Sequence, residues 1–256
     1  MQMKPSIWCP GFNASDPLAQ GMAAYWPLWD GDGSRAMDLV GGHHGDLVGS
    51  PTWIGDGVNL SGANQWINTG ASWLRSGDND FTIWARCRLT GTSGDMTLFS
   101  DWTSEGVLLR YDATSNRWEL YYTYQSSANL LWSDTTMEDG DWHDVAIFAN
   151  SDIIAIVFDG VIVASQSTTG TYTPTDGGGF YIGSRPNEDT EWIGDVAAVA
   201  GWRRTLSPGE LASLSLDPYR LIRHRTPLPL WTAATQGGGA PPTPTGMAAQ
   251  YRRRIA

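Results

Sequence analysis

Cysteine and histidine are scarce in this chain, with two and four copies among 256 residues. Two cysteines cannot form a disulfide framework, and four histidines leave little for imidazole chemistry. No apolar run approaches the 18 residues of a membrane-spanning helix, so no membrane span is expected. The first residues carry a charge but no apolar stretch of the kind that a secretory signal needs.

Glycine, proline and tryptophan are plentiful, with 30, 14 and 14 copies. They separate many short apolar runs, which favours an all-β domain over a helical one. The chain is long enough for one β-sandwich of about 200 residues and a tail.

Charge is distributed unevenly. Residues 1–216 hold 10 basic and 26 acidic residues, a net charge of −16, whereas residues 217–256 hold six arginines and Asp217 alone, a net charge of +5. An acidic body disfavours nucleic acid and anionic membranes as its partners. The basic end is suited to an acidic protein surface, including that of another copy.

A β-hairpin is predicted by two apolar, largely β-branched runs, 153–158 and 161–164, on either side of Asp159-Gly160. Both turn residues tolerate the positive φ angles of a type I′ turn. Both faces of this hairpin are apolar, with Ile162 and Ala164 expected on the outer one. Either loops or another subunit must therefore cover that face.

Further segments extend the pattern, with a strand predicted to start at Trp142-His143 and a hairpin expected over 57–68. Another strand is predicted over 81–89, and its alternation indicates that Cys87 is a small buried hydrophobe. A helix is predicted after Ser207, with Glu210 at the capping-box position. Together these segments resemble the laminin-G-like, concanavalin A-like lectin (jelly-roll) superfamily. The resemblance implies a two-sheet antiparallel sandwich over residues 23–216.

The remaining segments differ in composition from the sandwich. Residues 1–22 are expected to form an extended N-terminal arm, 217–233 a connector, 234–246 a flexible linker of Gly, Pro and Thr, and 247–256 a basic C-terminal peptide. The predicted anchor within this peptide consists of Tyr251, Arg252, Arg253, Arg254 and Ile255.

Catalytic residues are hard to find. Jelly-roll glycosidases carry two carboxylates on one strand, but Glu188 and Glu191 lie in a polar stretch and would face opposite sides of a strand. The G-x-S-x-G motif is missing. We therefore expect a protein that is not an enzyme.

Calcium is the one cofactor that the resemblance suggests, because many laminin-G-like domains hold it at a loop rim. Asp30, Asp32 and Asp38 offer three carboxylates in a glycine-rich loop. The acidic pair of the family's "G-x-I-D-E-V" segment is replaced here by Ala197 and Ala198, so no inherited site is expected there. The neighbouring His43-His44 is interpreted as a structural turn.

Aromatic residues could form a glycan-binding platform, since sugars stack their apolar faces on indole and phenol rings. Packing inside the sheet is the alternative for the same residues. The candidates are Trp102, Tyr111, Trp118, Tyr121 and Tyr122.

These observations favour a non-enzymatic structural or decoration protein of a phage virion. The family resemblance without an export signal predicts a protein assembled in a host cytoplasm, and the body followed by its linker resembles tailed-phage structural proteins. The expected partners are capsid or tail proteins, other copies of the chain and cell-surface glycans. A bacterial carbohydrate-binding module or adhesin is the alternative, and a glycoside hydrolase is third.

Overall fold

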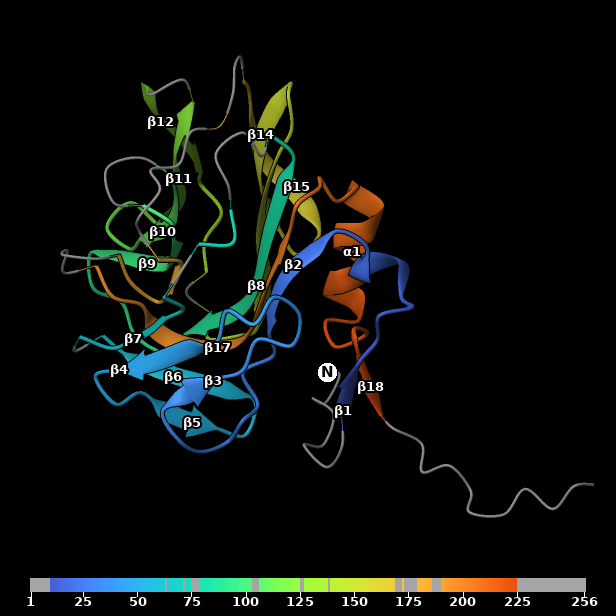
Figure 1. Ribbon diagram of the computed structural model, residues 1–256. Helices are drawn as coiled ribbons and strands as arrows, with labels where there is room; N and C mark the ends of the chain where they lie inside the picture. Colours follow the sequence, from blue (N-terminus) through green and yellow to red (C-terminus); the bar gives the residue numbers. More distant parts are fainter. Residues whose placement is uncertain are drawn as a thin grey trace, which may run out of the picture. The chain divides into compact units, whose positions relative to one another are not determined.

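The computed structural model describes residues 10–62, 64–70, 72–74, 79–102, 106–124, 127–137, 139–168, 172, 179–185 and 190–224. The chain divides into two units, Met1–His224 and Arg225–Ala256. Within the first unit, two antiparallel sheets hold most of the regular structure (Figure 1), which confirms the predicted all-β sandwich. No helix within the described ranges is long and apolar enough to span a membrane.

The first sheet has eight strands in the order β12-β11-β10-β9-β16-β7-β4-β3. In that order the strands are β12 (Ser127–Ser133), β11 (Arg117–Tyr124), β10 (Val107–Asp112), β9 (Asp95–Ser100), β16 (Tyr181–Ile182), β7 (Trp66–Asn68), β4 (Gly45–Val48) and β3 (Arg35–Ala36).

The second sheet follows the order β15-β14-β13-β8-β17-β6-β5, and β2 also pairs with β17. These strands are β15 (Val161–Ser167), β14 (Ile153–Phe158), β13 (His143–Ala149), β8 (Phe81–Leu89), β17 (Ile193–Trp202), β6 (Gly57–Ser61), β5 (Thr52–Ile54) and β2 (Met22–Trp26). β17 organises this sheet, because β8 pairs along its length while β6 and β2 pair with its first and second halves.

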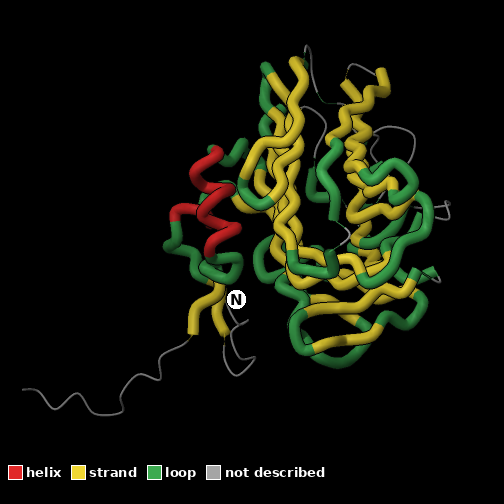
Figure 2. Tube along the Cα trace, turned by 180° about the vertical axis from the view of Figure 1, so that it is seen from behind, coloured by secondary structure: helices red, strands yellow, loops and turns green. Residues whose placement is uncertain are grey.

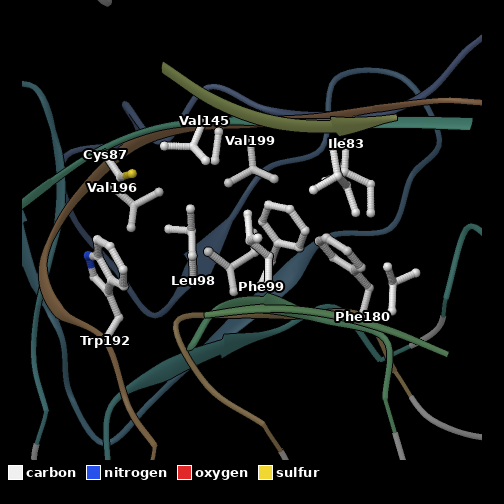
Figure 3. Packing of buried hydrophobic residues seen from close by; sticks show 14 of the residues in the cluster. Ile83, Cys87, Leu98, Phe99, Val145, Phe180, Trp192, Val196 and Val199 are labelled. Atoms are coloured by element: carbon white, nitrogen blue, oxygen red, sulfur yellow. The ribbon is translucent and has the colours of Figure 1, made fainter. Parts of the chain in front are cut away.

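The main core lies between the two sheets. Figure 3 shows Leu98, Phe99 and Phe180 from one sheet pointing at Cys87 and Val199 from the other. Cys87 is fully buried, as predicted from the alternation of its strand. Each large apolar side chain buried here contributes about 1.5–3 kcal/mol.

A second core covers the opposite face of the β8–β17 sheet. Ala155 and Val157 of β14 pack there against Leu211 and Leu214 of α1 (Pro208–Leu216), which Figure 1 shows beside that face. The predicted capping box is confirmed, since the Ser207 side chain accepts from the backbone of Glu210 and the Glu210 carboxylate accepts from the backbone of Ser207. On the outer face of the hairpin, Ala155 and Val157 are therefore covered, whereas Ile162 is 40% exposed.

The Asp159-Gly160 hairpin is confirmed, with φ angles of 48° and 78° at the two turn residues. The register shifts between Ile156 and Val157, so Ala164 pairs with Ile156. Ala164 then packs against the main core, and its predicted position on the outer face is wrong. An extra residue in one strand reverses the alternation beyond it, and composition did not indicate such a bulge.

The expected hairpin over residues 57–68 is also corrected. β6 joins the sheet of β17, whereas β7 pairs with β4 and β16 of the other sheet. The chain crosses from one layer to the other here, because both strands have an apolar face and each layer supplies one side of the same core.

A small two-stranded ribbon lies outside both sheets. β1 (Pro10–Phe12) pairs with β18 (Ile222–His224), and Pro10 stands opposite His224. Figure 2 shows this ribbon beside the helix, where Phe12 and Ile222 pack into the second core. The 3₁₀ helix η1 (Pro17–Ala19) then leads toward β2.

Candidate functional site

Strand alternation divides the predicted aromatic platform between two faces. Tyr111, Trp118 and Tyr122 are buried in the main core, where they pack and cannot reach a ligand. Tyr121 and Trp102 lie elsewhere, with their ring centroids 6.3 Å apart, but Trp102 is buried as well, with only 8% of its surface exposed. Successive side chains of a strand point to opposite faces, so neighbours in the sequence did not remain neighbours in space.

The outer face of β10 and β11 holds a compact polar cluster around Glu119. This glutamate is only 2% exposed and lies opposite Arg110 in the register of the sheet. Arg110 donates through Nε and Nη2 to Glu119 Oε2 at 2.8 and 2.7 Å, and through Nη2 to the Tyr121 hydroxyl at 2.7 Å. Its Nη1 lies 2.6 Å from Oδ2 of Asp95.

A second arginine engages the other oxygen of Glu119. Arg117 donates to Glu119 Oε1 through Nε at 2.8 Å and also through Nη2. Its guanidinium lies over the ring of Trp132, 5.7 Å from the centroid. Trp132 stands opposite Glu119 on β12 and is 52% exposed. We call Arg110, Arg117, Tyr121 and Trp132 the arginine–aromatic face.

Each ring of this region has a cation against it. The guanidinium of Arg110 lies 4.7 Å from the Tyr121 centroid, and that of Arg185 lies 5.8 Å from the Trp102 centroid. Burial raises the pKa of the Tyr121 phenol above its ordinary value, so the hydroxyl stays protonated at neutral pH. These contacts restrict the rings, and a flat rigid ring loses little entropy when a ligand stacks on it.

The three predicted calcium ligands do not converge. Asp38 is buried and accepts hydrogen bonds from the backbone nitrogens of Tyr25, Val40, Gly41 and His43 at 2.8–3.0 Å. Asp30 accepts from Met37 N at 3.2 Å, and Asp32 is exposed. In the described part of the chain, no group of three or more His, Cys, Asp or Glu residues is placed to hold a metal ion.

The histidines of this loop have structural contacts. His44 Nδ1 accepts from Asp38 N at 3.0 Å, and the His43 carbonyl accepts from Trp26 Nε1 at 2.7 Å. Both contacts fix the turn, as the sequence interpretation expected.

The remaining candidates for acid–base chemistry are dispersed. Glu191 is next to the strand β17, in a bridge with Thr97, and Glu188 lies outside the described residues. His143 contacts Asp159 through Nδ1 at 2.8 Å and Asp139 through Nε2 at 3.0 Å. The hydrogen bond with Asp159 raises the pKa of His143 above its ordinary value, and the two contacts hold the imidazole at the hairpin turn.

The five anchor residues Tyr251, Arg252, Arg253, Arg254 and Ile255 lie outside the described residues. Their predicted role in assembly stays a prediction.

Sequence reasoning missed Trp132, the most exposed ring of the arginine–aromatic face. A signal for it was present, because Leu131 is apolar and inward, so the alternation of β12 turns Trp132 outward. Alternation also places Arg117 and Glu119 on one face, because they are two residues apart on β11, whereas the pairing of Glu119 with Arg110 on β10 had no such signal.

Comparison with protein families gives a match over more than half of the chain. The laminin G model of the concanavalin A-like lectin/glucanases superfamily covers residues 61–212. No curated protein sequence matches this chain.

Solved structures with the same fold are distant in sequence. Trypanosoma rangeli sialidase in complex with sialic acid is 17% identical, with a TM-score of 0.58 over 78% of this chain and 33% of that one. The binding domain of Paraclostridial Mosquitocidal Protein 1 is 12% identical, with a TM-score of 0.64 over 79% and 53%. The chain thus spans about one third and one half of these two structures.

A third structure is matched almost entirely. Domain 4 of AbnA, a GH43 extracellular arabinanase from Geobacillus stearothermophilus, in complex with arabinotriose, is 15% identical, with a TM-score of 0.56 over 76% of this chain and 98% of that one. At these identities the likeness shows the fold alone.

Proposed function

Since the chain belongs to the concanavalin A-like lectin/glucanases superfamily, we propose that it is a non-enzymatic module that binds glycans on the arginine–aromatic face. Trp132 is the observation that carries the proposal. An indole that is half exposed on a sheet, with a guanidinium over it, offers a flat apolar surface for the face of a sugar ring.

The buried carboxylate gives the face its rigidity. Glu119 holds the two arginines in place, and they in turn lie against Tyr121 and Trp132. Charge-assisted hydrogen bonds of this kind are short and directional, so the rings are oriented before a ligand arrives. The nitrogens of Arg110 also have Asp95 beside them, which favours hydroxyl-rich ligands over strong anions.

The same geometry argues against catalysis on this face. A glycosidase needs one carboxylate free to attack or to activate water and a second that carries a proton. Both oxygens of Glu119 accept hydrogen bonds from arginines, and the nearby Asp95 is paired with Arg110. Neither can approach an anomeric carbon without breaking these contacts.

The test of this proposal is a glycan array probed with the full chain and with Trp132→Ala. We expect every glycan that binds the full chain to bind Trp132→Ala at least about tenfold more weakly, as for an anchor tryptophan in an interface. Trp53→Ala is the matched control, because Trp53 is a partly exposed tryptophan of the other sheet. Absence of any retained glycan, or equal binding by Trp132→Ala, would refute the proposal.

We further propose that the module is displayed on a phage virion and held there by its terminal segments. The ribbon of β1 and β18 supports this arrangement, since it brings Pro10 and His224 together at one place. Removal of residues 234–256 is expected to abolish incorporation into particles while the first unit stays folded. Sedimentation with purified particles measures this, and unchanged incorporation of the truncated chain would contradict the anchor.

A further inference from the structure

A groove of about 590 Å³ lies away from the arginine–aromatic face, at the end of β8. It is lined by residues 88–92 and by Asp139 and Gly140. Its volume is within the range of about 300–1,000 Å³ of small-ligand sites. Its lining is mixed and includes Leu89 beside an arginine, two threonines and an aspartate.

Arg88 is held in this groove from two sides. Its Nε donates to Oδ2 of Asp195 at 2.7 Å, and its guanidinium lies 4.8 Å from the centroid of the Trp142 ring. Asp195 is itself buried and accepts a second hydrogen bond from Asn59 Nδ2 at 2.6 Å. The stacked Trp142 ring and the buried Asp195 carboxylate therefore fix the orientation of the guanidinium plane.

The terminal nitrogens of Arg88 remain available. Its side chain is 35% exposed, and Nη1 and Nη2 form no hydrogen bond with any residue that the structure describes. Two N–H groups in one plane match the two oxygens of a carboxylate, which lysine cannot reproduce. A pre-oriented arginine with unused donors in a groove indicates a planar anionic group as ligand.

The groove also offers hydrogen-bond acceptors. Asp139 is half exposed, and its carboxylate is oriented by Nε2 of His143 at 3.0 Å. Thr90 is fixed by a hydrogen bond from its backbone nitrogen to the Ile193 carbonyl, and its side chain is exposed, as is that of Thr92. Hydroxyl groups of a ligand can donate to Asp139 and exchange hydrogen bonds with the threonines.

We propose that this groove binds a carboxylate-bearing sugar, a hexuronate residue, as a second glycan site of the module. The carboxylate pairs with the terminal nitrogens of Arg88, and ring hydroxyls contact Thr90 and Asp139. A monoanion fits better than phosphate, because Asp139 lines the same groove and the chain carries a net charge of −11.

The inference goes beyond the proposed function, because it adds a site that does not include Trp132.

An NMR titration tests the site. The full chain is titrated separately with galacturonate, glucuronate, galactose and sodium sulfate, and the amide shifts of Arg88, Thr90 and Gly91 are followed. We expect both uronates, and neither galactose nor sulfate, to shift these resonances in a saturable way. The Trp132→Ala variant should behave like the wild type here.

Two variants test the role of Arg88. Arg88→Lys keeps a positive charge beside Asp195 but loses the planar pair of donors, so uronate binding should weaken about tenfold to a hundredfold. Arg88→Gln should abolish it. The matched control is Arg35→Lys, because Arg35 is an exposed arginine on β3 with a loose contact to Asp46.

Four results would overturn the inference: no saturable shift with either uronate, equal shifts with galactose, sulfate binding as tight as uronate binding, or unchanged affinity in Arg88→Lys. A urea unfolding midpoint of Arg88→Lys equal to that of the wild type excludes misfolding as the cause of a loss. Failure of the Trp132 experiment alone leaves the uronate result unaffected, so the two proposals are separable.

Discussion

Replacement of Glu119 by alanine should lower the free energy of unfolding by about 1.5–3 kcal/mol, because the partly buried Arg110 loses its charge-assisted hydrogen bonds to this carboxylate. Urea denaturation measures the loss. The same variant should bind glycans more weakly than the wild type, since Arg117 no longer has Glu119 to hold it over Trp132.

Two substitutions serve as controls for this result. Glu119→Gln keeps a similar shape and one acceptor oxygen, so its loss should be intermediate. Glu191→Ala removes a partly exposed glutamate and should change the free energy of unfolding by no more than about 0.5 kcal/mol. A loss below about 1 kcal/mol in Glu119→Ala would mean that the existing contacts of Arg110 with Asp95 and of Arg117 with Asp112 are sufficient, and that the buried carboxylate is not what orders the face.

Replacement of Asp38 by alanine is expected to cost about 2–4 kcal/mol. Four backbone N–H groups lose their acceptor, and each one left without a partner costs about 1–3 kcal/mol where water cannot reach it. Asp38→Asn keeps one acceptor oxygen and should lose about half as much. The matched control is Asp46→Ala, because Asp46 is an exposed aspartate on β4 whose removal should cost less than about 1 kcal/mol.

The Asp38 experiment also tests the calcium hypothesis. If this carboxylate serves only the backbone, addition of EDTA or calcium leaves the thermal midpoint of the wild type unchanged. A calcium-dependent rise in the midpoint that disappears in Asp38→Ala would instead support a metal site at this loop. A cost below about 0.5 kcal/mol for Asp38→Ala would show that water replaces the lost acceptor.

Features governed by neighbouring residues could be predicted from the sequence. Asp159-Gly160 determines its turn because few residues adopt two successive positive φ angles. Ser207 and Glu210 determine the start of α1 through contacts that span three residues. Cys87 could be placed in the core because Phe81, Ile83, Ala85 and Leu89 share its face of the strand.

Features that depend on distant segments could not be predicted in this way. The apolar pattern of residues 57–68 identifies two strands, but it does not say that they belong to different sheets. Likewise, nothing near Ala155 and Val157 indicates that a helix some 50 residues later covers them. Bulges add to this difficulty, because one extra residue moved Ala164 to the other face.

The candidate site was only partly predictable for a related reason. Aromatic residues occupy both faces of β11, so composition alone could not separate Trp118 in the core from Tyr121 outside it. Alternation separates them once one residue of the strand is placed. The grouping of Arg110, Arg117 and Trp132 around Glu119 needed the register of three strands.

The ribbon of β1 and β18 has a mechanical consequence. Its two strands run antiparallel, and Pro10 faces His224 at the open end. Tension applied through both flanking segments would therefore unzip three residue pairs one at a time, rather than shear them together. The ribbon would open at low force and lengthen the connection between the sandwich and its flanking segments. The hydrogen bonds between β17 and β8 would carry no load until the ribbon is fully open.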